Sequence, residues 1–400
     1  MNDPISDPFS DPIGDRVHMA RAIRLAVLGL YTAEPNPRVG CVLVRDGEVV
    51  GEGWHQRTGG PHAERLALAM AGDRARGATA YVSLEPCCHH GKTPPCTDGL
   101  IQAGVARVVA AMRDPNPLVA GQGLARLRAQ GIEVVVGLLE EEARRLNPGF
   151  IKRMEQGLPY VRCKLAASLD GRTAMASGES QWITSAAARR DAQFLRARSA
   201  AILTGVGTLL ADDPALNVRL TARELPGVER DSQIHQPVRV VVDSRLRTPP
   251  TARMLTLPGT TLIACLTADS GRAAPLEAAG AQVLVTPPGP GGVDLEFLLR
   301  YLARQEINEV LIEAGSTLAG SALQAGLVDE LVLYLAPHLM GDAGSGLCHL
   351  PGLELMRDRL PLAIQDVRRV GPDLKVTALT PAPPGPSPPS ASRVRVAAKS

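Results

Sequence analysis

Short apolar runs typical of strands alternate with segments of helical periodicity along most of this chain, which restricts the fold to the α/β class. A hairpin signal occurs near the start, where residues 41–45 and 48–50 flank Asp46-Gly47, a pair that readily supplies positive φ in a tight turn. The length of 400 residues exceeds what one hydrophobic core usually organises. We therefore expect two α/β domains.

The first domain is expected over residues 15–156. Helical spacing of apolar residues covers residues 16–30, and further helices are expected at 61–71, after Cys96 and at 124–129. Strands are expected at 80–84, 105–111 and 132–136. A single charged helix over residues 140–157 then leads toward Pro159, where we place the domain boundary.

The second domain is expected over residues 157–380 and begins with a strand at 160–166. Its other strands are expected at 201–204, 238–242, 261–265, 283–285, 309–312 and 331–335. The Asp-Pro repeats at the N-terminus predict a disordered arm over residues 1–14. The Pro/Ser-rich residues 381–400 cannot build a core and predict a disordered tail.

Composition limits the classes of function. The formal net charge is +2, no long basic run occurs and aromatic residues are only 3% of the chain, which argues against a broad nucleic-acid or membrane surface. No apolar run is long enough for a membrane span, and the N-terminus lacks the regions of a signal peptide. The 7 cysteines are an odd number, typical of reduced thiols. We therefore expect a cytoplasmic protein without membrane or nucleic-acid partners.

The strongest signal for function is a pair of motifs at residues 61–64 (Pro-His-Ala-Glu) and 86–96 (Pro-Cys-Cys-His-His-Gly-Lys-Thr-Pro-Pro-Cys). A catalytic zinc ion takes three protein ligands of N/S type and leaves one position for water. His62, Cys87 and Cys96 supply such a set. Both motifs are expected at helix starts, where unpaired backbone N–H groups favour the metal-binding thiolate. The motifs therefore predict a catalytic zinc site.

Glu64 lies two residues after His62, so it would stand beside the open position without binding the metal. A carboxylate there can accept a proton from water and deliver it to a leaving amine. His-x-Glu with Pro-Cys is the zinc deaminase signature, although eight residues replace the usual two between the cysteines. Cys88, His89 and His90 are therefore competing ligands. A structural zinc knuckle, closed by four ligands, is the alternative interpretation.

The second half of the chain offers polar loops after strands, with neither a metal cluster nor a nucleophilic triad in its sequence. Residues 204–208 (Thr-Gly-Val-Gly-Thr) follow one apolar run, and residues 313–320 follow another and open a helix. Glycine lets a backbone approach phosphates closely, and a helix N-terminus favours anions. The Gly-x-Gly pair alone is weak because it is not the Rossmann pattern. These residues predict only a phosphate-binding α/β domain.

Several motifs together resemble the family of bifunctional riboflavin-biosynthesis deaminase/reductases. They span about residues 15–378 and include 84–96, 114–117 (Asp-Pro-Asn-Pro), 164–174, 178–184, 211–216 and 312–320. The resemblance implies an N-terminal cytidine-deaminase-like three-layer α/β/α domain and a C-terminal dihydrofolate reductase-like α/β domain that binds NADPH. A homo-oligomer is also expected.

For the deaminase, the resemblance implies that the three predicted ligands bind Zn²⁺, that the wide cysteine spacing is the family's own variant, and that Glu64 is the proton shuttle. It further implies that Asn36, His55 and Lys92 contact a pyrimidine ribose phosphate. Each of these three has a plainer alternative. Asn36 could be a turn former between two prolines, His55 a strand-end histidine and Lys92 a solvated loop lysine.

For the reductase, the resemblance implies two sets of contacts. The residues expected to meet NADPH are Ala166, Trp182, Thr208, Asp212, Ser244, Gly315, Ser316, Thr317, Leu318, Ala319, Gly320 and Ser321. The residues expected to meet the substrate are Ser180, Arg196, Leu216, Arg219 and Glu313. Two arginines suit a sugar phosphate because guanidinium groups bind phosphate bidentately.

Three residues in the second half of the chain could have a purely structural role instead of a ligand contact. Arg196 could lie on the solvated face of a helix that includes residues 189–198. Trp182 could be a packing residue, since tryptophan is usually largely buried. Lys164, in the first strand of the second domain, could polarise the substrate or cap the edge of the sheet.

The reaction implied by the resemblance has two steps. Hydrolytic deamination of 2,5-diamino-6-(5-phosphoribosylamino)pyrimidin-4-one is followed by NADPH-dependent reduction of the ribosyl group, giving 5-amino-6-(5-phosphoribitylamino)uracil. Residue spacing alone implies only deaminase chemistry. There are three alternatives to this bifunctional enzyme. They are a deaminase acting on nucleic acid, a non-enzymatic zinc module that recruits partners through its Pro-rich tail, and a chain that retains only one of the two activities. The near-neutral charge argues against the first.

Overall fold

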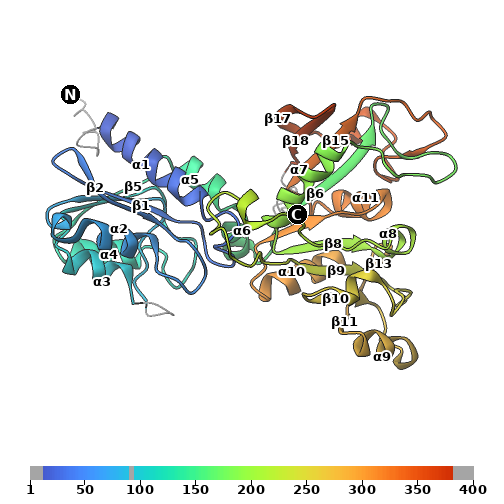
Figure 1. The fold of residues 1–400 in the computed structure, drawn as a ribbon, viewed down its shortest axis with the longest axis horizontal. Coiled ribbons are helices and arrows are strands. Elements are labelled where there is room, and N and C mark those ends of the chain that lie inside the picture. The colour runs from blue at the N-terminus through green and yellow to red at the C-terminus, as the bar shows by residue number, and fades with distance from the viewer. Residues whose placement is uncertain (1–11, 90–93, 382–400) are drawn as a thin grey trace, which may run out of the picture.

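The computed structural model describes residues 12–89 and 94–381, and they form two α/β units (Figure 1). The N-terminal unit is built on a five-stranded sheet of order β2-β1-β3-β4-β5. Its strands are β1 (Gly40–Arg45), β2 (Glu48–Trp54), β3 (Thr79–Val82), β4 (Arg107–Ala110) and β5 (Glu133–Val136). β1 is antiparallel to β2 and β3, whereas β3, β4 and β5 are parallel. The predicted hairpin is confirmed, with positive φ at Asp46 and Gly47.

Helices cover both faces of this sheet, as Figure 1 shows. They are α1 (Pro12–Val27), α2 (Ala63–Ala71), η1 (Gly72–Ala75), α3 (Cys96–Gln102), α4 (Gln122–Ala129), α5 (Glu140–Leu146) and α6 (Pro148–Gln156). Cys41 and Leu43 of β1 join a core cluster with α2, α3 and α4. Val42 and Val44, on the opposite face, join a cluster with α1, α5 and α6. The alternation of strand side chains therefore builds the predicted α/β/α layers.

Two expectations for this unit are wrong in detail. Residues 12–14, assigned to the arm, form the first turn of α1, and residues 1–11 lie outside the described residues. The single helix expected over residues 140–157 is two helices, α5 and α6, which meet at Asn147. The residue before a proline is biased away from the helical region, and Pro148 follows Asn147. The freed Asn147 side chain bonds the backbone N–H and carbonyl of Arg38, each at 2.8 Å.

The C-terminal unit is built on a nine-stranded sheet of order β11-β10-β9-β8-β14-β6-β15-β18-β17. Its strands are β6 (Tyr160–Ser168), β8 (Ala201–Gly205), β9 (Val238–Val242), β10 (Thr261–Cys265), β11 (Ala281–Val285), β14 (Glu309–Ile312), β15 (Glu330–Ala336), β17 (Ala363–Val370) and β18 (Asp373–Leu379). The strands from β11 to β15 are parallel. The antiparallel hairpin β17–β18 extends one edge of the sheet and was not predicted.

Helices also cover both faces of the larger sheet. They are α7 (Ala186–Ala197), α8 (Val206–Asp212), α9 (Ser270–Ala278), α10 (Leu295–Arg304) and α11 (Ser316–Gln324). Apolar residues of α10 and α11 pack in one core cluster, and those of α7, α8 and α9 pack in another. The shorter elements are β7 (Arg172–Ala174), β12 (Pro288–Gly289), β13 (Gly292–Val293), β16 (Ser345–Gly346), η2 (Ala222–Glu224), η3 (Arg253–Thr256) and η4 (Met356–Asp358).

Buried charges join the two units. Glu309, at the start of β14, accepts a hydrogen bond from Arg38 of the N-terminal unit at 2.6 Å and also pairs with Arg162. A second, less buried ion pair links Lys152 of α6 to Asp329 at 2.7 Å. The N-terminal unit therefore meets the C-terminal sheet at the amino end of its central strand.

The helices among residues 12–89 and 94–381 include none of the length and apolar character that a membrane span requires.

Candidate active sites

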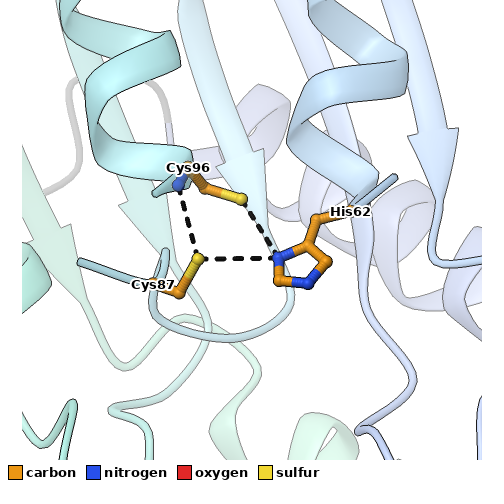
Figure 2. A group of neighbouring side chains, drawn as sticks. All are labelled: His62, Cys87 and Cys96. Carbon is orange, nitrogen blue, oxygen red and sulfur yellow. Dashed lines mark hydrogen bonds between the residues drawn. The ribbon is translucent and has the colours of Figure 1, made fainter. Parts of the chain in front are cut away.

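Three side chains in the N-terminal unit form a metal-binding group (Figure 2). His62 is the N-cap of α2, Cys96 is the first residue of α3, and Cys87 lies in the loop after β3. Nδ1 of His62 lies 3.5 Å from Sγ of Cys87 and 3.3 Å from Sγ of Cys96. In tetrahedral zinc coordination with Zn–N about 2.0 Å and Zn–S about 2.3 Å, N and S ligands are about 3.5 Å apart. The group therefore fits a zinc ion.

The helix expected after Cys96 is confirmed, since α3 begins at that residue, and Cys87 lies in the loop before it. The helix nevertheless reaches it, since the backbone N–H of Cys96 donates to Sγ of Cys87 at 3.3 Å. Hydrogen bonding with Cys96 lowers the pKa of Cys87 to about 4, and the same contact raises the pKa of Cys96. The thiolate is the form of cysteine that binds a divalent cation, so the lowered pKa of Cys87 suits a metal ligand.

Among residues 12–89 and 94–381, the metal-binding group consists of these three side chains. The competing candidates Cys88 and His89 are not part of it, and His90 lies outside the described residues. Three protein ligands leave a tetrahedral position for water, whereas a structural site is closed by four. The described geometry therefore favours a catalytic site over the zinc knuckle.

Glu64 lies in the first turn of α2 and lines the same cavity as His62. Its side chain is buried, and burial raises the pKa of the carboxyl group. A raised pKa suits a carboxylate that accepts a proton and later returns it near neutral pH.

The cavity has a volume of about 370 Å³ and is lined by Asn36 and His55 as well as by His62 and Cys87 of the metal-binding group. Nδ2 of Asn36 and Nε2 of His55 are 3.1 Å apart, and Nδ1 of His55 lies 3.1 Å from the carbonyl oxygen of Pro61. Burial lowers the pKa of His55, so the ring is neutral near pH 7. The neutral ring can donate to Pro61 and accept from Asn36. Lys92, the third predicted contact, lies outside the described residues.

Several cavity residues were not predicted as site residues. Asp114 and Asn116 belong to a motif that supported only the resemblance, and burial raises the pKa of Asp114 to about 7. Phe150, Arg153 and Met154 come from α6, and Glu306 comes from the C-terminal unit. The Asp-Pro-Asn-Pro motif could have identified Asp114 and Asn116 as site residues. Phe150, Arg153, Met154 and Glu306 belong to no recognisable motif in the sequence.

A second cavity, of about 830 Å³, opens at the carboxyl ends of β8 and β9 beside the start of α11. Such ends are where ligands bind in open parallel sheets. Oγ1 of Thr208 accepts a hydrogen bond from the backbone N–H of Gly315 at 3.1 Å and so ties α8 to the N-cap of α11. The predicted cofactor residues that line it are Thr208, Asp212, Ser244, Gly315, Ser316, Thr317, Leu318 and Ser321.

Four predicted cofactor residues do not line this cavity. Ala319 is fully buried in the core, and a Cβ on Gly320 would lie 2.0 Å from the carbonyl oxygen of His349, so both face away. Ala166 packs against the core cluster of α7, α8 and α9. Trp182 is 69% exposed, with the guanidinium of Arg189 stacked 4.5 Å from its ring centroid. The interpretation of Trp182 as a buried packing residue is therefore wrong.

Arg196 and Glu313, both predicted substrate contacts, bind each other. Nε and one terminal nitrogen of Arg196 donate to the two carboxylate oxygens of Glu313 at 2.6 and 2.9 Å. Each side chain is only 12% exposed, so the solvated-face interpretation of Arg196 is wrong. Burial acts to raise the pKa of Glu313, but Arg196 and Lys164 outweigh it and hold that pKa at about 2.

The other expected substrate contacts are more scattered. Leu216 is buried in a core cluster, Ser180 is half-buried and Arg219 is exposed. Lys164 lies in β6, which is flanked by β14 and β15, so it does not cap a sheet edge. Burial lowers the pKa of Lys164, and its Nζ lies 5.9 Å from the ring centroid of Tyr334.

Two protein-family models match this chain, one in each half. A family model described as the cytidine and deoxycytidylate deaminase zinc-binding region matches residues 14–112. A second, described as the RibD C-terminal domain, matches residues 159–376.

Full-length relatives share both parts. The riboflavin biosynthesis protein RibD of Escherichia coli is 56% identical over 362 residues, which are 90% of this chain and 98% of that protein. RibD of Haemophilus influenzae is 50% identical over 91% of this chain and 96% of that protein.

Two solved structures cover nearly the whole chain. Acinetobacter baumannii RibD, form 1, has a TM-score of 0.85 and 45% identity, covering 93% of this chain and all of the other. A diaminohydroxyphosphoribosylaminopyrimidine deaminase/5-amino-6-(5-phosphoribosylamino)uracil reductase from Thermotoga maritima has a TM-score of 0.80 and 32% identity, covering 92% and 99%.

Proposed function

Because this chain belongs to the RibD family of bifunctional riboflavin-biosynthesis proteins, we propose that the cavity beside His62 carries out its deamination and the cavity beside α11 its reduction. The protein is a zinc-dependent pyrimidine deaminase and an NADPH-dependent reductase. It deaminates 2,5-diamino-6-(5-phosphoribosylamino)pyrimidin-4-one and then reduces the ribosyl group to give 5-amino-6-(5-phosphoribitylamino)uracil.

In the first cavity, His62, Cys87 and Cys96 hold the zinc ion. When bound, zinc supplies Lewis acidity that lowers the pKa of a water molecule. Glu64 accepts the proton of the attacking water and returns it to the departing ammonia, a role that its buried position beside the ligands supports. Asn36, oriented through the neutral ring of His55, binds the pyrimidine. Lys92 remains a predicted substrate contact.

In the second cavity, the start of α11 and the residues around Thr208 bind NADPH. When bound, NADPH supplies the hydride for reduction of the ribosyl group. The backbone at the start of α11 suits the cofactor's phosphates because helix N-termini favour anions. The family resemblance makes Glu313, Ser180 and Arg219 the substrate contacts, and Arg196 holds Glu313 in one orientation. These three side chains are not among the residues that line the second cavity.

We place the domain boundary after Gln156, the last residue of α6, with the deaminase domain over residues 15–156 and the reductase domain over 157–380. Gly157 ends α6 in the left-handed region, which supports a boundary there. A cytoplasmic location is also part of the proposal, supported by seven free cysteines. The homo-oligomer and the lack of a nucleic-acid partner stay predictions.

The observation that carries this assignment is the three-ligand group, two members of which, His62 and Cys87, line one cavity with Glu64. The test is Glu64→Gln, which keeps the size of the side chain but cannot take up a proton. We expect the variant to retain zinc, to lose ammonia release and to reduce the deaminated intermediate at the wild-type rate. Normal ammonia release by this variant would show that Glu64 is not the proton shuttle.

A further inference from the structure

The C-terminal domain contributes to the wall of the deamination cavity, and we propose that Asn308 of that domain is a positioning residue for deamination. The inference rests on the proposed function, since it takes the cavity beside His62 as the deamination site. Glu306, two residues earlier, lines this cavity, whereas Asn308 itself does not. Asn308 therefore acts through the residues that it holds.

One side of Asn308 holds the segment that leads into Asn36. Its backbone N–H donates to Oε1 of Glu34 at 2.8 Å, and its Nδ2 donates to Oε2 of the same carboxylate at 3.0 Å. Nδ2 also donates to the carbonyl oxygen of Pro35 at 2.8 Å. Because Pro35 directly precedes Asn36, these bonds fix the chain at the point where the pyrimidine contact projects into the cavity.

The other side of the same amide holds a second part of the wall. Nε of Arg153 donates to Oδ1 of Asn308 at 2.6 Å. Arg153 belongs to α6 and lines the cavity, with its guanidinium 6.0 Å from the ring centroid of Phe150. A long arginine side chain has considerable rotamer freedom, and a bond to one of its N–H groups removes much of it. Asn308 thus orders Arg153 as well as the segment before Asn36.

The amide of Asn308 is difficult to replace. The residue is 2% exposed, so water cannot take over its hydrogen bonds. The acceptors at Glu34 and Pro35 and the donor at Arg153 define which end of the amide is oxygen and which is nitrogen. A Cβ on Gly149 would lie 2.5 Å from the carbonyl oxygen of Asn308, so the start of α6 also packs directly on this residue.

These contacts predict which kinetic constant responds. The zinc ligands and Glu64 lie on α2, α3 and the loop after β3, none of which Asn308 contacts through the bonds above. The groups that it orders form the surface against which the substrate binds. Loss of Asn308 should therefore raise the KM of deamination and change kcat little.

The experiment compares four full-length variants: Asn308→Ala, Glu34→Ala, the double variant and Lys152→Met. Lys152 is the matched control, because it is adjacent to Arg153 in α6 and makes another interdomain contact, to Asp329, without lining the cavity. Ammonia release is followed against substrate concentration, and reduction of the deaminated intermediate is followed by NADPH absorbance.

We expect Asn308→Ala and Glu34→Ala each to raise the KM of deamination, by about tenfold for Asn308→Ala, with kcat within about threefold of wild type. The double variant should raise KM by less than the product of the two single effects, because both single changes break the bond from Nδ2 of Asn308 to Glu34, while the backbone N–H bond is lost only with Glu34. Reduction should be unchanged in all four variants, and Lys152→Met should deaminate with the wild-type KM.

Additive effects in the double variant would overturn the proposal, because the two residues would then act separately. An equal rise in KM for Lys152→Met would overturn it too, because any interdomain bond would then suffice. If Asn308→Ala does not fold, an unchanged KM for Glu34→Ala decides against the proposal by itself. Loss of ammonia release in Glu64→Gln tests the site separately, so an unchanged KM in the Asn308 and Glu34 variants refutes only this inference.

Discussion

Replacing Glu309 by glutamine should destabilise the protein strongly, because its carboxylate is 1% exposed and lies among three guanidinium groups. One oxygen accepts from Arg38 at 2.6 Å, while the other pairs with Arg162 and lies 3.5 Å from Nε of Arg198. Glutamine keeps the volume but turns an N–H₂ group toward these donors. Removing one partner of a buried ion pair costs about 3–5 kcal/mol, since the remaining charge is left uncompensated.

Thermal unfolding measures this cost. At roughly 2–4 °C per kcal/mol for domains of this size, Glu309→Gln should lower Tm by roughly 6–20 °C. Lys152→Met is the control, because its interdomain ion pair is more exposed than that of Glu309, with side chains 14% and 23% exposed, so its loss should cost less. Equal losses in the two variants, or a loss below about 1 kcal/mol for Glu309→Gln, would refute the reasoning that burial decides the magnitude.

The same carboxylate predicts a pH dependence. Burial acts to raise the pKa of Glu309, but Arg162, Arg38 and Arg198 outweigh it and hold the pKa well below its ordinary value of 4.5. In acid, the unfolded chain therefore takes up this proton before the folded protein does. The stabilising contribution is complete above about pH 4.5 and is lost as the pH falls further. Urea unfolding at neutral and acid pH should show a smaller acid loss for Glu309→Gln than for wild type.

Arg196→Lys should lower kcat/KM of reduction by about tenfold to a hundredfold and leave ammonia release unchanged, because lysine cannot make both N–H contacts to the carboxylate of Glu313. Wild-type kcat/KM on the deaminated intermediate would contradict this role. Gly320→Ala should cost about 1–3 kcal/mol, since its Cβ would lie 2.0 Å from the carbonyl oxygen of His349. An unchanged midpoint in urea unfolding would show that α11 can move away.

The zinc site is the part of the molecule that the sequence predicted best. Metal chemistry restricts the ligands to a few residue types, so His62, Cys87 and Cys96 stood out without any knowledge of packing. The helix expected after Cys96 is also confirmed, since α3 begins at Cys96. The prediction of the ligands did not depend on that detail.

Two kinds of feature could not be predicted. The residues of β17, Ala-Ile-Gln-Asp-Val-Arg-Arg-Val, do not alternate between apolar and polar types, so they lack the pattern by which a strand is recognised in sequence. Arg196 reads as one of several charges on a helix, and only the fold brings the carboxylate of Glu313 to it across 117 residues. Both depend on tertiary neighbours, which local patterns do not contain.

The strand β14 has residues of the two sites at its two ends, although a domain boundary separates the sites. Asn308 directly precedes β14 and bonds residues at the wall of the deamination cavity. Glu309 is the first residue of β14, and Glu313, which pairs with Arg196, follows its last residue. At about 3.3 Å per residue, the two ends are about 17 Å apart. All four residues of β14 are buried between β8 and β6, and close-packed interiors resist displacement of such a strand. The boundary at residue 157 thus separates two hydrophobic cores, whereas the side chains that support the first cavity come from both sides of it.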